Sequence, residues 1–121
     1  MKSVLAVAAA AEAAIGVALM INPSFVARLL LGDGVAGVAI ALGRVAGIAL
    51  LALGVACWPR SDNVGRLSPI AGLLCYNVLT TAFLIYLATA GGSAGILFWP
   101  TVGFHTAMSW LLARVVGRTG A

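Results

Sequence analysis

The stretch VLAVAAAAEAAIGVALMI, residues 4–21, decides the fold of this chain. It contains one charge, Glu12, and a helix that crosses a membrane needs about 20 mainly apolar residues. Three further stretches share this character, at residues 35–58, 69–90 and 95–116. None of the four alternates between apolar and polar residues as a strand does. Because backbone groups in lipid must be hydrogen-bonded within their own segment, we expect each stretch to be a helix.

The composition indicates that lipid is the solvent. Of 121 residues, 63% are hydrophobic and only 8% are charged, whereas a soluble globular protein carries about 25% charged residues. We therefore predict an all-α integral membrane bundle of four antiparallel transmembrane helices, forming a single membrane domain over residues 1–121. The net charge of +4 does not indicate nucleic-acid binding, because the basic residues are scattered and form no basic stripe.

A short helix is expected after the first span. Asn22 is suited to an N-cap and Pro23 to the first helical position, which predicts a helix over residues 24–31. One continuous helix over residues 4–31 would measure roughly 42 Å and exceed the hydrocarbon core. The short helix is therefore predicted to lie at the membrane interface, and Gly-Asp-Gly at 32–34 to form the turn into the second span.

The start of the first span also resembles a secretory signal, with Lys2 ahead of an apolar run and Ala-Glu-Ala at 11–13. The charge of Glu12 in the middle of the run favours a retained helix.

The distribution of basic residues predicts the orientation. Four spans place both termini and the second connection, residues 59–68, on one side of the membrane. The other side has Arg28, close to Asp33. Because basic residues concentrate on the cytoplasmic side, both termini are expected in the cytoplasm. The basic residues on that side are Lys2, Arg60, Arg66, Arg114 and Arg118.

Three ionisable residues lie away from the ends of the predicted spans, and they appear at one depth. Glu12 lies nine residues before Ile21, Arg44 nine after Val35 and His105 nine after Ile96, or roughly 13 Å from the non-cytoplasmic surface. A charge at the bilayer centre costs at least about 2.5–3.5 kcal/mol, so we predict that Glu12 and Arg44 form an ion pair inside the bundle. The full predicted intramembrane polar cluster is Glu12, Arg44, His105, Asn77, Thr80 and Thr81.

Two interpretations of this cluster remain open. It is either a structural clasp that fixes helix register or a proton relay or polar substrate site. The clasp is preferred, because a carboxylate paired with arginine would stay ionised and carry protons poorly.

Small residues predict a close contact between the first two spans. They recur every four positions in each span, which is the spacing of close helix packing in membranes. The two predicted faces are Ala39, Gly43 and Gly47, and Ala6, Ala10 and Ala14.

No catalytic motif is present, and no cofactor or metal is expected. Cys57 and Cys75 lack the spacing of metal ligands, and His105 is the single histidine. The expected activity is therefore non-enzymatic.

The segment AEAAIGVALM, residues 11–20, resembles the first helix of small multidrug resistance transporters. That resemblance implies a proton-coupled transporter in which Glu12 is the shared proton and cation site. In that family no buried arginine accompanies the glutamate, whereas Arg44 is predicted level with Glu12 here.

A second resemblance spans more of the chain. The segments GRVAG at 43–47 and LLALG at 50–54, and Trp99-Pro100 followed by His105, resemble small uncharacterised bacterial four-helix membrane proteins of the DoxX-like type. This resemblance implies an accessory or scaffold component of a bacterial-type inner membrane. The expected partners are membrane lipid and further copies of the chain or a larger membrane complex. A membrane redox or quinone-associated role is a further alternative.

Overall fold

The computed structural model describes residues 1–60, 67–92 and 94–119, and all regular structure within them is helical. The charged connection predicted at 59–68 lies mostly outside the described residues. The helices are α1 (Lys2–Ile21), α2 (Pro23–Leu31), α3 (Val38–Ala56), α4 (Leu67–Thr89) and α5 (Phe98–Thr119).

Three helices are long and apolar enough to cross a membrane, namely α1, α3 and α4 from Pro69 to Thr89. The fourth predicted span corresponds to α5, which has 22 residues. It carries Pro100, His105 and Arg114 and is more polar than the other three. The prediction of an all-helical fold with membrane-spanning helices is confirmed to that extent.

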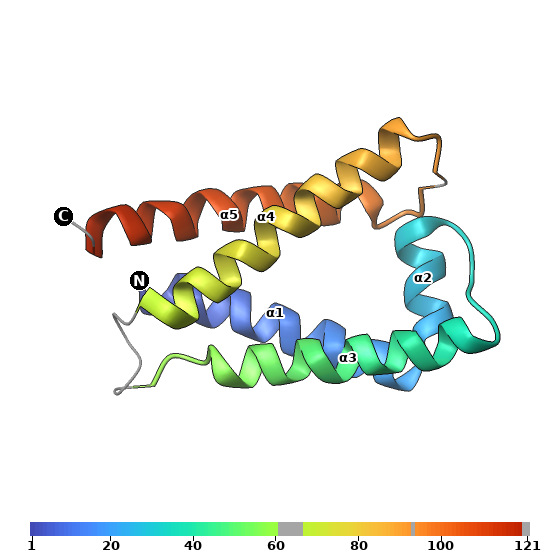
Figure 1. Ribbon diagram of the computed structural model, residues 1–121, viewed down its shortest axis with the longest axis horizontal. Helices are drawn as coiled ribbons and strands as arrows, with labels where there is room; N and C mark the ends of the chain where they lie inside the picture. Colours follow the sequence, from blue (N-terminus) through green and yellow to red (C-terminus); the bar gives the residue numbers. More distant parts are fainter. Residues whose placement is uncertain (61–66, 93, 120–121) are drawn as a thin grey trace.

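The helices form two pairs. α1 packs against α3, and α4 packs against α5. In Figure 1, α2 stands between the two pairs at one end of the molecule, while both chain termini lie at the opposite end. The molecule therefore consists of two helical hairpins that meet at one end and are bridged by α2 at the other.

The α1–α3 contact is close because glycines meet across it. A Cβ atom added to Gly47 would lie 2.6 Å from the carbonyl oxygen of Gly16. A Cβ atom added to Gly54 would lie 2.5 Å from the carbonyl oxygen of Ala9. Gly47 belongs to the predicted small-residue face, so the prediction is confirmed at that position, whereas Gly43 packs against Pro23 of α2. Ala39, by contrast, is exposed.

The predicted small-residue face of α1 is wrong. Ala10 and Ala14 are exposed, whereas Ala9 and Gly16 are buried and contact α3. Alanine is so frequent in α1 that its spacing does not distinguish one face from the next. The glycine at position 16 marks the face that α3 approaches.

The start and end of α2 follow the predicted local rules. The backbone N–H of Phe25 donates to the side-chain oxygen of Asn22 at 3.0 Å, and Pro23 takes the first helical position. Gly32 ends the helix with φ of +83°, a left-handed conformation that glycine adopts without a steric penalty. The second span begins later than predicted, since Gly37 with φ of +59° precedes α3.

Backbone hydrogen bonds join α2 to the segment before α5. The N–H of Gly95 donates to the carbonyl of Leu30 at 3.0 Å, and the N–H of Leu97 donates to that of Leu29 at 2.8 Å. The last carbonyls of a helix have no partner within it, so these two bonds satisfy them. The two bonds also attach α2, which lies between α1 and α3 in the chain, to the hairpin of α4 and α5.

The hydrophobic core lies at the end of the molecule that holds the termini. Its members come from α1, α4 and α5, together with Cys57 at the end of α3. Cys57 is buried, whereas Cys75 is exposed. The core residues are Leu5, Ala8, Ala9, Cys57, Ile70, Leu73, Met108 and Leu112.

The glycine contact predicts the effect of a single methyl group. We expect Gly47→Ala to lower the free energy of unfolding by about 1–3 kcal/mol, because its Cβ would overlap the α1 backbone. Gly72→Ala is the matched control, since no atom of the described neighbours lies within 4 Å of its Cβ position. There alanine should raise helix stability by about 0.5–1 kcal/mol. Equilibrium unfolding of both variants in mixed micelles measures the difference, and equal effects would contradict the packing described.

Candidate functional site

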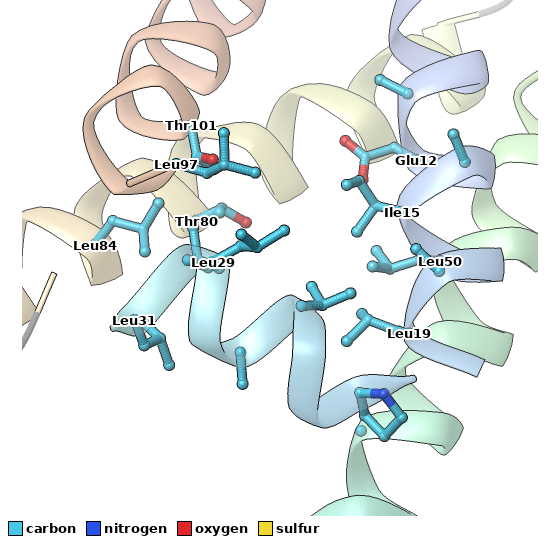
Figure 2. Close-up of a pocket in the computed structure, with 18 of the residues that line it drawn as sticks. Glu12, Ile15, Leu19, Leu29, Leu31, Leu50, Thr80, Leu84, Leu97 and Thr101 are labelled. Atoms are coloured by element: carbon cyan, nitrogen blue, oxygen red, sulfur yellow. The ribbon is translucent and has the colours of Figure 1, made fainter. Parts of the chain in front are cut away.

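A cavity of about 660 Å³ lies between the two hairpins. Side chains from all five helices line it, and most of them are apolar. Figure 2 shows Ile15 and Leu19 of α1 on one side, Leu84 of α4 on the other, and Leu29 on α2 below. The cavity therefore occupies the space that α2 keeps open between the hairpins.

Glu12 contributes the carboxyl group of this cavity. Its side chain is only 2% exposed and points from α1 into the cavity (Figure 2). Within the described part of the chain, Oε1 has no hydrogen-bond partner. The side chain of Tyr76 on α4 lies beside the Glu12 carboxyl group and interacts with it.

Tyr76 connects Glu12 with the polar residues of α4 and α5. Its side chain also interacts with that of Thr80, one helical turn further along α4. Its ring meets the ring of His105 edge-on, with the ring centroids 5.7 Å apart. The group contains one carboxyl, two hydroxyls and one imidazole, all among the residues that line the cavity.

The imidazole of His105 is held by Asn77. His105 Nδ1 lies 2.8 Å from Asn77 Oδ1, and Asn77 Nδ2 donates to the carbonyl of Leu73 at 2.8 Å. With the amide oriented in this way, Oδ1 accepts and His105 Nδ1 carries the hydrogen. Asn77 is fully buried and His105 is 7% exposed, so this pair fixes the orientation of the ring between α4 and α5.

Most of the predicted polar cluster comes together. Tyr76 joins it, whereas Thr81 and Arg44 do not belong to it. Glu12, His105, Thr80 and Asn77 lie in or directly beside the cavity. Thr81 does not line the cavity, and its buried Oγ1 has no hydrogen-bond partner in the described part of the chain.

The predicted Glu12–Arg44 ion pair is wrong. Arg44 is exposed, and in the described residues no ion pair joins it to Glu12. The reason is register, since Gly43 packs against Pro23 and so places Arg44 level with the end of α1. At 1.5 Å per residue, that level is roughly 15 Å from Glu12 along the helix. The prediction assumed that the first two spans end at one surface, but α3 begins beyond the end of α1.

Tyr76 was missed in the sequence. It precedes Asn77 and lies four residues before Thr80, a spacing that places Tyr76 and Thr80 on one helix face. A tyrosine in the middle of a span needs a partner for its hydroxyl. This requirement could have suggested Glu12 as the partner, because Glu12 is the one carboxyl group within the predicted spans.

The described residues contain no group of three His, Cys, Asp or Glu side chains placed to hold a metal ion. Comparison with protein-family models, with curated proteins and with solved structures finds no match. The site is therefore interpreted from its own geometry.

The Asn77–His105 pair predicts a stability effect. Asn77→Ala leaves the buried His105 N–H and the Leu73 carbonyl without their partner, which should cost about 1–3 kcal/mol. Thr106→Ala is the control, because its exposed hydroxyl donates only to the carbonyl of Val102, and such changes stay within about 0.5 kcal/mol. The free energies of unfolding of both variants give the comparison. If Asn77→Ala costs no more than the control, the pair does not hold the ring.

Proposed function

We propose that this chain is a non-enzymatic membrane protein that binds a hydrophobic molecule within the bilayer, in the cavity between its two hairpins. The cavity itself is the observation that supports this proposal. Its volume of about 660 Å³ lies within the roughly 300–1,000 Å³ of small-molecule sites. Its lining is mostly apolar and comes from all five helices, which is typical of sites for small hydrophobic molecules.

In this proposal α5 is the fourth membrane span, and the chain forms a four-helix bundle of the inner membrane. The placement of both termini at one end (Figure 1) is consistent with an even number of spans. The excess of basic residues that the sequence assigns to the side of the termini supports a cytoplasmic location for both. Membrane lipid surrounds the bundle, and a larger complex or further copies of the chain are its proposed partners. An accessory role there would be to hold the hydrophobic molecule for such a complex.

Filling the cavity tests the binding function. A photoreactive hydrocarbon carrying a diazirine should label Leu19, Leu29 and Leu84 in nanodiscs, and unlabelled hydrocarbon should compete. Ala18→Phe, which adds a ring to the cavity lining, should reduce this labelling by about tenfold, or 1.4 kcal/mol. Ala82→Phe adds the same ring on the exposed face of α4 and should leave the labelling unchanged.

Peptide mass spectrometry locates the labels. Labelling that does not saturate, or that Ala18→Phe and Ala82→Phe affect alike, would show that the hydrocarbon only dissolves in the surrounding lipid.

A second candidate function is proton-coupled transport through Glu12. The observation that favours it is that Arg44 lies far from Glu12 and so does not hold this carboxyl group ionised. Buried carboxyl groups within membranes commonly belong to proton or substrate pathways. Transport and binding in the same cavity are compatible, and they differ in their need for a group that gains and loses a proton.

Flux measurements distinguish transport from binding alone. In liposomes with an imposed pH gradient, the second candidate predicts protein-dependent proton flux that Glu12→Gln reduces to the rate of protein-free liposomes. Asp33→Asn is the matched control, because Asp33 lies in an exposed turn and its Oδ1 accepts from the N–H of Gly34, a bond that asparagine can also accept. Flux that survives Glu12→Gln would exclude a proton role for Glu12.

A further inference from the structure

Building on the proposed cavity function, we infer that the bound molecule is a neutral lipid-like alcohol, whose hydroxyl group meets Glu12 while its apolar body extends toward α2. Three features of the cavity indicate this chemical class of ligand. They are the hydrogen-bonding state of Glu12, the charges around Glu12 and the shape of the apolar lining.

The first observation is a buried carboxyl oxygen of Glu12, a residue that lines the cavity. The Glu12 side chain is only 2% exposed, and its Oε1 has no hydrogen-bond partner in the described residues. A buried polar atom without a partner costs about 1–3 kcal/mol. A ligand head that carries a hydrogen-bond donor can satisfy Oε1. A head that lacks a donor, such as an ether or ester, would leave the cost in place.

The second observation selects a neutral donor. No cationic side chain of the described residues contacts Glu12, and Arg44 lies about three helical turns away along the α1–α3 pair. A protonated amine would bring a charge, but desolvating two charges can cost more than their attraction returns. A hydroxyl group both donates and accepts, so it pairs with Glu12 whether the carboxyl is ionised or protonated. An acidic head would meet Glu12 as a like charge.

The cavity wall opposite Glu12 also favours a neutral hydroxyl head group. Thr80 and Thr101 lie across the cavity from Glu12 (Figure 2). Threonine hydroxyls also donate and accept, so they can accept from or donate to the same ligand hydroxyl. The polar groups at this end therefore match a head of one hydroxyl group better than a head that carries a formal charge.

The third observation concerns the body of the ligand. From Glu12 to Pro23 the chain advances eleven residues, which corresponds to roughly 16 Å of wall. Ile15 and Leu19 line this length on α1, and Leu29 and Leu31 of α2 add further apolar side chains to the lining (Figure 2). The lining offers no polar partner there, so the ligand body has to be apolar.

A matched series of 14-carbon compounds tests the inference. Tetradecan-1-ol, its methyl ether, tetradecylamine and tetradecanoic acid compete in nanodiscs with the photoreactive hydrocarbon for the cavity. We expect the alcohol to compete at about a tenfold lower mole fraction of lipid than the ether, the difference of one hydrogen bond at 1.4 kcal/mol. The amine and the acid should both compete less well than the alcohol.

Variants at Glu12 assign the preference to its carboxyl group. Glu12→Gln keeps an acceptor and should retain the preference for the alcohol over the ether. Glu12→Leu removes the acceptor and should abolish that preference, while competition by the ether stays unchanged. Unchanged labelling of Leu84 by the hydrocarbon shows that each variant keeps the cavity.

Three results would overturn the inference while leaving the binding function intact. They are equal competition by alcohol and ether, tighter binding of the amine or the acid, and a preference for the alcohol that survives Glu12→Leu. If the hydrocarbon does not label the cavity saturably in the parent protein, the proposed function fails and the inference fails with it.

Discussion

The attachment of α2 to the second hairpin is the constraint on which the site depends. Two backbone hydrogen bonds, from Gly95 to Leu30 and from Leu97 to Leu29, join the helix end to the segment before α5. The approach is so close that a side chain at Gly95 would collide with the Leu29 carbonyl. α2 therefore separates the hairpins at one end, while the apolar core joins them at the other, and the cavity lies between the two.

This arrangement explains the state of Glu12. The α1–α3 pair is locked in register by Gly16 and Gly47, so Arg44 stays near the end of α1 and cannot approach the carboxyl group. The second hairpin supplies Tyr76 instead. The carboxyl group thus lies at the wall of a mainly apolar cavity, which in our proposal accommodates the hydroxyl group of a ligand. The polar groups serve recognition in this account, in addition to any role in holding the helices together.

Local features of the fold could be predicted from the sequence, whereas the register between helices could not. Asn22, Pro23 and Gly32 act on their immediate neighbours, so the start and end of α2 followed from residue type. The predicted depths of Glu12 and His105 also agree with their place in one cavity. Arg44 was misplaced because its depth depends on how far α3 extends beyond α1, which no local pattern encodes. Tyr76 was overlooked because its importance arises only when α4 faces α1.

In our proposal a lipid-like molecule enters between the hairpins. A long-chain alcohol with a nitroxide on its tail tests this entry through paramagnetic broadening of leucine methyl signals. Leu84 is 3% exposed and lines the cavity, whereas Leu79 on the same helix is 64% exposed. We predict that the Leu84 methyl signals broaden more than those of Leu79. Broadening that follows surface exposure instead, with Leu79 affected and Leu84 spared, would contradict the account.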